Sequence, residues 1–218
     1  MISFEQIKQS PQVKTCIAHA DETLRAMGYT EHSFAHVAYV ADRAGDFLKR
    51  LGYPEHDVEL ARIAGYLHDI GNIVNRADHA QSGAIMAFRL LDQMGADIED
   101  IAIIVSAIGN HDESTAFPVN AIAAALILAD KTDVRRSRVR NSDFATFDIH
   151  DRVNYAVVET ATEITGDGAF VLRLRIENSI CAVMEYFEIF LTRMMLCRRA
   201  ADKLGLRFKL FINSQELL

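Results

Sequence analysis

The sequence predicts a mainly α-helical protein with a small α+β tail, and three observations support this fold class. Through the first two thirds of the chain, apolar side chains recur at three- and four-residue steps, which is the period of an amphipathic helix. Glycine and proline interrupt this pattern at short intervals, as they do between helices joined by brief links. From about residue 143 the side chains alternate between apolar and polar around a Thr-Gly-Asp-Gly turn, which favours a β-hairpin.

Several helices are expected before residue 143. In the first, Val13, Ile17 and Leu24 share one face, and Gly28 follows the last apolar position. The helices are expected at residues 12–27, 31–51, 54–70, 78–94, 97–110 and 120–140. Because the links between them are short, we expect these helices to pack as one compact bundle.

The tail is expected to contain a β-hairpin, a long apolar helix and a final strand. The strands are expected at residues 153–164, 169–176 and 206–212, and the helix at residues 179–204. The polar stretch over residues 141–151 predicts a boundary between a helical domain, residues 1–142, and a tail, residues 143–218. An exposed final strand favours pairing with another chain, so we expect the tail to form a homodimer interface or, alternatively, to complete a pocket.

Composition restricts the class of protein. The chain has 218 residues, with 23 basic and 30 acidic side chains and a formal charge of -7, and it has no long basic run that favours generic nucleic-acid binding. No segment has the roughly 18 consecutive apolar residues that a membrane span requires, and the N-terminus lacks a secretory pattern. The three cysteines have no CxxC spacing, so we expect buried thiols in a cytoplasmic protein.

A histidine-aspartate doublet closes the third expected helix. His68 and Asp69 precede Gly71, where the backbone is expected to bend, so that both side chains can reach one metal ion. Imidazole nitrogen and carboxylate oxygen suit divalent Fe, Mn, Zn, Co or Mg, and the lack of paired cysteines argues against a structural zinc site. Alternatively, the histidine only interacts with the negative end of its helix, and the aspartate is a solvated cap.

Four further residues are candidate ligands because of their positions on the expected helices. His36 lies in the preceding helix, His79 begins the next one, and His111 ends the fifth. Asp130 directly follows the most apolar stretch of the chain, so it is expected to lie near the core. An unpaired charge is costly there, and a cation is its natural partner. With the doublet, these residues predict a catalytic metal centre.

This pattern resembles that of the HD-domain metal-dependent phosphohydrolases, in which a lone histidine precedes a His-Asp doublet and a distal aspartate. His36, the doublet and Asp130 follow that order in the motifs LHDIGN and LADK, and the resemblance covers about residues 15 to 140. It implies an HD-type helical bundle and a hydrolase in which His68 and Asp69 are catalytic metal ligands.

The resemblance extends to a dinuclear branch of the family. The segment HAQSGA, which begins at His79, is similar to the one that carries an extra histidine in the symmetrical dinucleoside tetraphosphate hydrolases. It implies that Asp69 bridges a first ion to a second one held by His79 and His111. Some dinuclear branches have a His-His pair where this chain has His111 and Asp112, so both one and two divalent ions per chain stay open.

The reaction that the resemblance implies is hydrolysis of a phosphoester or phosphoanhydride bond by metal-activated hydroxide. The substrate is expected to be a nucleotide or another small phosphorylated molecule. Metal ions and basic side chains are expected to bind it, because the chain has no glycine-rich phosphate loop. The candidate substrate contacts are Lys131, Arg135, Arg76 and Asn72.

Two alternatives stay open. The same metal core can serve a signalling hydrolase for a cyclic dinucleotide or guanosine tetraphosphate, and a non-catalytic HD protein can sense a nucleotide or a metal. Other polar residues are expected outside the site: Asp133 in a salt bridge rather than orienting a ligand or substrate, and His19, His56 and His150 at the surface or in packing. His32 lies one turn before His36 and is expected to face solvent or, alternatively, the same cleft as His36.

Overall fold

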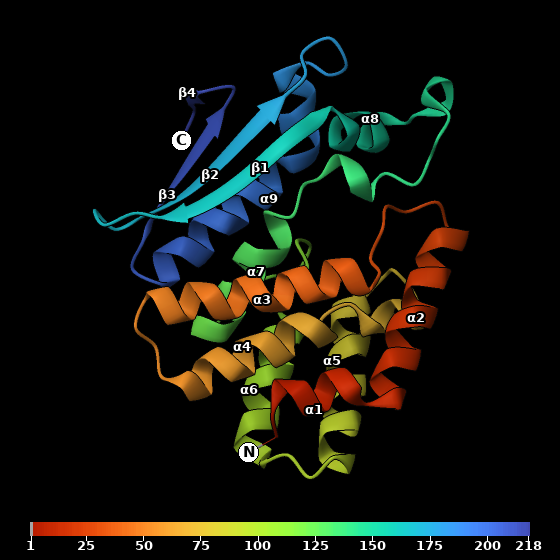
Figure 1. The fold of residues 1–218 in the computed structure, drawn as a ribbon, viewed down its shortest axis with the longest axis vertical. Coiled ribbons are helices and arrows are strands. Elements are labelled where there is room, and N and C mark those ends of the chain that lie inside the picture. The colour runs from red at the N-terminus through yellow and green to blue at the C-terminus, as the bar shows by residue number, and fades with distance from the viewer. Residues whose placement is uncertain (1) are drawn as a thin grey trace.

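The computed structural model describes residues 2–218, and it confirms a mainly α-helical fold with a small α+β tail (Figure 1). The bundle contains α1 (Phe4–Gln9), α2 (Pro11–Ala26), α3 (Phe34–Arg50), α4 (Glu55–Leu67), α5 (His79–Gln93), α6 (Ile98–Gly109) and α7 (Ala121–Lys131). The tail contains α8 (Ile149–Ala156), β1 (Val157–Ile164), β2 (Ala169–Ile176), α9 (Val183–Lys203), β3 (Arg207–Ile212) and β4 (Gln215–Glu216). Three short 3-10 helices, η1 (Ile70–Ile73), η2 (Arg136–Arg138) and η3 (Phe144–Thr146), lie in the links.

Helix α7 lies at the centre of the molecule because it is apolar on every side. Its residues 123–129 are fully buried, and the helix packs against α3, α4, α6 and α9. The side chain of Asn120 accepts a hydrogen bond from the backbone of Ala123 and caps the start of this helix. The C-terminal end of α7, which carries Asp130, is therefore held in the middle of the fold.

Two glycines allow the backbones around the His-Asp doublet to approach closely. A β-carbon on Gly65 would lie 2.7 Å from the Cα atom of Ala41, so α3 and α4 pack at this distance only because the residue is glycine. A β-carbon on Gly71 would lie 2.0 Å from the carbonyl oxygen of His79 and 2.4 Å from the backbone nitrogen of Gly83. The loop after the doublet is thus pressed against the start of α5.

The tail sheet has the strand order β1-β2-β3-β4. Strands β1 and β2 form the expected antiparallel hairpin, with Thr160 opposite Leu174. Strand β3 runs parallel to β2, with Leu172 opposite Leu210, and α9 is the crossover between them. In Figure 1 α9 lies between the sheet and the bundle, and it contacts both α7 and β3. The tail is therefore packed onto the helix that carries Asp130.

Several element boundaries differ from the prediction. Helix α7 ends at Lys131 instead of continuing to about residue 140, since the arginines that follow bind groups far along the chain: Arg136 pairs with Glu177, and Arg138 donates to the carbonyl oxygen of Glu31. Residues 149–156 form α8, so the first strand starts later than expected. Helix α1 and strand β4 were not expected, and β4 covers the outer edge of β3 at Phe211 and Ile212. The homodimer stays a prediction.

Among the described residues, no helix has both the length and the apolar character needed to cross a bilayer. The three cysteines are free thiols: Cys181 and Cys197 are buried, as expected, and Cys16 is partly exposed.

Candidate metal centre

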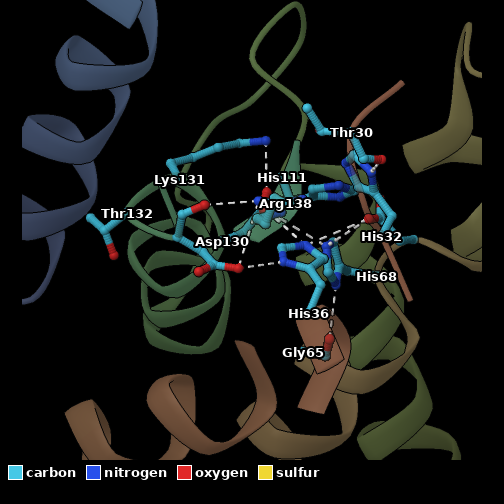
Figure 2. Close-up of polar contacts among 12 residues, drawn as sticks. Thr30, His32, His36, Gly65, His68, His111, Asp130, Lys131, Thr132 and Arg138 are labelled. Carbon is cyan, nitrogen blue, oxygen red and sulfur yellow. Dashed lines mark hydrogen bonds and ion pairs between the residues drawn. The ribbon is translucent and has the colours of Figure 1, made fainter. Parts of the chain in front are cut away.

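Six of the predicted site residues converge at the centre of the bundle, although they come from five different elements. His36 projects from α3, the doublet follows α4, and His79 starts α5. His111 follows α6, and Asp130 is near the end of α7. The four histidines and Asp69 are at most 5% exposed, and the Asp130 side chain is 12% exposed. Figure 2 shows His36 and His68 together with Asp130 facing them.

Each of the four imidazoles is fixed through its Nδ1 atom. These atoms lie within hydrogen-bond distance of an acceptor: His36 of Asp133 Oδ2 at 2.8 Å, His68 of the Gly65 carbonyl at 2.8 Å, His79 of the Arg76 carbonyl at 3.0 Å and His111 of the Ile108 carbonyl at 2.6 Å. An Nδ1–H donor to an oxygen acceptor leaves a lone pair on Nε2 in the neutral ring. This is the usual outer contact of metal-binding histidines.

One group of ligand atoms fits a first metal ion. His36 Nε2 lies 3.4 Å from Asp130 Oδ1, and His68 Nε2 lies 3.3 Å from Asp69 Oδ2. The Nε2 atoms of His36 and His68 and the Oδ2 atom of Asp69 are buried without a hydrogen-bond partner among the described residues. Burying such groups unpaired is costly, and a divalent cation among them would satisfy all three. Ligand atoms of His36, His68 and Asp130 lie within 4.8 Å of one another.

A second group of ligand atoms shares Asp69 with the first. Ligand atoms of His68, Asp69 and His111 also lie within 4.8 Å of one another. His79 Nε2 lies 3.2 Å from His111 Nε2 and 3.6 Å from Asp69 Oδ1. Asp112, which stands where some dinuclear branches have a second histidine, has Oδ1 4.0 Å from His79 Nε2. The donor set therefore fits a second cation, with Asp69 between the two.

Burial keeps the outer imidazoles in the neutral form that a metal ligand needs. It lowers the pKa of His111 to about 3, with help from His68 and Lys131, and it lowers the pKa of His79. His68 differs: burial lowers its pKa, but Asp69 and Asp130 outweigh this effect and raise it. A proton on His68 and a metal ion thus compete for the same two carboxylates.

Asp133 forms the salt bridge that we expected, with Arg135 and Arg138, and it also orients His36. Its side chain is completely buried, and besides facing His36 it accepts two hydrogen bonds from Arg135 and lies 3.6 Å from Arg138. Burial raises the pKa of Asp133, but the hydrogen bond with His36 and the charge of Arg138 outweigh it and bring the pKa to about 2. Asp133 therefore remains an anion that fixes the ring of His36.

Two of the candidate substrate contacts have structural partners instead. Asn72 is fully buried and donates to the carbonyl and to Oδ1 of Asp69, at 2.9 and 3.0 Å, so it orients this carboxylate. Arg135 donates hydrogen bonds to Asp133 and lies over the ring of Tyr39. Neither residue is among the described residues that line the cavity above the centre.

That cavity has a volume of about 510 Å³ and opens directly from the ligand groups. Asp69, His79, His111 and Asp130 are among its lining residues. The other two candidate substrate contacts, Lys131 and Arg76, also line it. A site of this size accommodates a small organic molecule.

Lys131 is buried between two carboxylates. Its Nζ lies 2.7 Å from Asp130 Oδ2 and 3.5 Å from Glu113 Oε1. Burial lowers the pKa of Lys131, but Asp130 and Glu113 outweigh it and raise the pKa. Glu113 in turn accepts a hydrogen bond of 2.7 Å from Arg193 on α9. Burial raises the pKa of Glu113, and Lys131 and Arg193 bring it down to about 2. This chain of charges joins the tail to the metal centre.

Several cavity residues were missed from the sequence. His32 lines the cavity although it was expected to face solvent, and His150, which is exposed as expected, lines it as well. The ring of His32 contacts that of His36, and its Nδ1 lies 2.7 Å from the carbonyl of Thr30. Its spacing of one helical turn before His36 was the available signal. For Glu113 and Arg193, which meet across 80 positions of sequence, no local signal exists.

Comparison with known proteins agrees with this geometry. Residues 33–135 match the model of the HD domain family. The matched range begins just before α3 and ends just after α7, so it contains all six converging residues but not α8, α9 or the sheet. This part of the chain is therefore similar to an HD domain, and together with the His/Asp clusters the match supports a metal-dependent hydrolase.

The chain was also compared with solved structures and curated proteins. It is similar to the crystal structure of a predicted HD superfamily hydrolase from an uncultured Thermotogales bacterium, with 25% sequence identity and a TM-score of 0.43. The similarity covers 60% of this chain and 73% of that chain. The comparison with curated proteins gave no match.

Proposed function

We propose that this protein hydrolyses a phosphoester or phosphoanhydride bond in a nucleotide or another small phosphorylated molecule. One observation carries the proposal: four imidazoles, each fixed through Nδ1, direct their Nε2 atoms toward one another and toward Asp69 and Asp130, at the floor of a cavity. Packing of the bundle does not require four buried imidazoles and two carboxylates in one place. This set matches the ligands of a hydrolytic metal centre.

The residues divide into three roles. His36, His68 and Asp130 would hold one divalent ion, and His79 and His111 a second, with Asp69 shared between them. Bound there, divalent ions supply activation of water near neutral pH and neutralisation of phosphoryl charge. Asp133 and Asn72 fix the directions of His36 and Asp69.

Arg76 is the best candidate for binding the substrate phosphate. It lines the cavity, and among the described residues no carboxylate pairs with it: its Nη1 lies 3.4 Å from Asn72 Oδ1 and from His79 Nε2. A guanidinium can bind phosphate oxygens through two parallel hydrogen bonds. Lys131 is the second candidate, but its charge is already shared between Asp130 and Glu113.

The test combines metal analysis with a hydrolysis assay. We expect the protein purified without chelator to contain close to two divalent ions per chain and to hydrolyse p-nitrophenyl phosphate, bis-p-nitrophenyl phosphate or a nucleoside phosphate. Asp69→Ala should lose both properties, because it removes the shared ligand. Asp42→Ala, which removes an exposed carboxylate on α3, is the matched control and should change neither. A metal-loaded protein that hydrolyses none of these compounds would contradict the proposal.

The alternatives make different predictions in the same assay. A signalling hydrolase would act on cyclic dinucleotides or guanosine tetraphosphate in preference to monophosphates. A non-catalytic sensor would bind nucleotide without turnover, which the complete donor set argues against. All six candidate ligands come from one chain, so the proposed reaction does not depend on the homodimer.

A further inference from the structure

The outer wall of the cavity is built by the tail, outside the range that matches the HD domain. Asp148, which caps α8, and Asp151 and Asn154 within α8 line it, and we call these three residues the α8 wall. Phe190 and Arg193 of α9 also line the cavity. Residues 33–135 therefore supply the metal centre, while the tail supplies much of the surface that faces the rest of a substrate.

Side-chain exposure shows which end of the cavity is deep. The side chains of His79 and His111 at the metal centre are almost completely buried, whereas that of Asp148 is 66% exposed. The phosphoryl group to be cleaved belongs at the buried end, next to Arg76. The α8 wall thus stands at the mouth, where the opposite end of the substrate would lie.

The α8 wall offers hydrogen-bond acceptors. Asn154 Nδ2 donates to the carbonyl of His150, which leaves its Oδ1 as an acceptor and one N–H as a donor. Asp151 accepts one hydrogen bond from Asn141, and Asp148 accepts one from the backbone of Asp151. A carboxylate has about four acceptor positions, so most of this capacity is unused. A ligand that satisfies the wall must carry hydroxyl or amino donors.

Among the described residues, no lysine or arginine forms an ion pair with the carboxylates of the α8 wall. Among the ion pairs of the described residues, none joins Asp151 to a basic group, and Asp148 pairs only with His150, at 3.8 Å. Three arginines in and around the tail already have carboxylate partners, since Arg193 donates to Glu113, Arg138 lies against Asp133, and Arg152 of α8 binds Glu185. A second phosphate at the mouth would therefore meet carboxylates without a compensating charge.

We propose that the α8 wall binds the end of the substrate remote from the scissile phosphate by accepting hydrogen bonds from its hydroxyl or amino groups. The substrate class is then a molecule with one phosphorylated end and one donor-rich, non-anionic end, such as a nucleoside 5′-monophosphate. Exposed Met27 and Tyr29 in the same cavity offer apolar surface to its body. The inference rests on the proposed function. It disfavours guanosine tetraphosphate, which carries phosphate on both sides of its ribose, and cyclic dinucleotides, whose ring contains two phosphodiesters.

The test compares nucleoside 5′-monophosphates with the corresponding 3′,5′-bisphosphates, which share the 5′-phosphate and add a second anion. For the metal-loaded full-length protein we expect kcat/KM to be about tenfold or more higher for the monophosphates. In the double variant Asp148→Asn and Asp151→Asn this preference should fall at least severalfold, mainly through KM. Asparagine also caps helices, so α8 should persist in the variant.

Glu163→Gln is the matched control, because it removes one exposed carboxylate on β1 away from the cavity, and it should leave the preference intact. A binding measurement by calorimetry, with phosphonate analogues in which carbon replaces the ester oxygen, separates this inference from the proposed reaction. Hydrolysis of both substrates without preference, or binding that favours the bisphosphate analogue, would overturn the inference alone. Preferential binding of the monophosphate analogue without any hydrolysis would refute the reaction and support the α8 wall.

Discussion

His79 Nε2 and His111 Nε2 lie 3.2 Å apart, while the Nδ1 atom of each ring faces a backbone carbonyl. If both Nδ1 atoms are donors, two lone pairs face each other across this distance, which is unfavourable unless a proton or a cation lies between them. Burial lowers the pKa of both rings, which disfavours the proton. The pair is therefore arranged for a cation.

The first prediction concerns this pair. His79→Ala and His111→Ala should each reduce the metal content by about one ion per chain, since His36, His68 and Asp130 remain for the other. Elemental analysis of the purified variants measures this, with His19→Ala, an exposed histidine on α2, as control. An unchanged metal content in both variants would leave a mononuclear centre.

The second prediction concerns Asp133. Asp133→Asn keeps the size of the side chain but removes the anion that faces His36 and two arginines. Loss of such an outer contact typically weakens metal affinity about 10- to 100-fold. Competition with a fluorescent chelator measures the affinity, and Asp42→Asn on the exposed face of α3 is the control. Equal affinities in Asp133→Asn and the wild type would show that Asp133 only stabilises the fold.

The third prediction concerns the loop after the doublet. Gly71→Ala places a methyl group where the carbonyl of His79 lies, so the loop and α5 must separate. We expect the free energy of unfolding to fall by about 2 kcal/mol or more and the metal affinity to drop with it. Gly166→Ala is the control, because a β-carbon at this position in the hairpin turn would have nothing within 4 Å. Denaturant titration measures the free energy of unfolding, and metal analysis measures the metal content. Equal stability and equal metal content in the two variants would contradict this prediction.

The fourth prediction concerns the cysteines. Burial raises the pKa of Cys197 to about 12 and that of Cys181 to about 11, whereas Cys16 is partly exposed. Since the thiolate is the reactive form, a thiol reagent at pH 8 should label Cys16 first and the other two only after unfolding. Because the folded-state pKa of Cys197 is raised, its contribution to stability is full below pH 9.0 and is lost as the pH rises toward 12. Peptide mapping of the labelled protein identifies the sites.

Most residues of the candidate metal centre could be predicted from the sequence because they lie in recognisable motifs at helix ends. His68, Asp69 and Asp130 are marked by the polarity of their neighbours, and the structure brings them together as the pattern implied. Whether they bind metal stays a prediction. The expected salt bridge of Asp133 is present, but its second role, orienting His36, was not favoured, because both roles have the same sequence signature, one turn after Asp130. Only the packing of α7 against α3 distinguishes them.

The outer half of the cavity could not be predicted from the sequence in this way. The pattern after residue 131 suggested a longer helix, but the arginines there find partners as distant as Glu31 and Glu177, and these tertiary contacts override local helix propensity. Residues 149–156 were predicted as linker and strand. They form α8 instead, and this helix brings Asp151 and Asn154 to the cavity mouth. Long-range placement of this kind leaves no local pattern.

Glu113 is held from both sides, by Lys131 of the helical bundle and by Arg193 of the tail. Exchanging the tail for one from another protein would leave this carboxylate short of a counter-charge unless a matching arginine came with it. New substrate preferences are therefore easier to evolve by point changes along the rim than by swapping the whole segment.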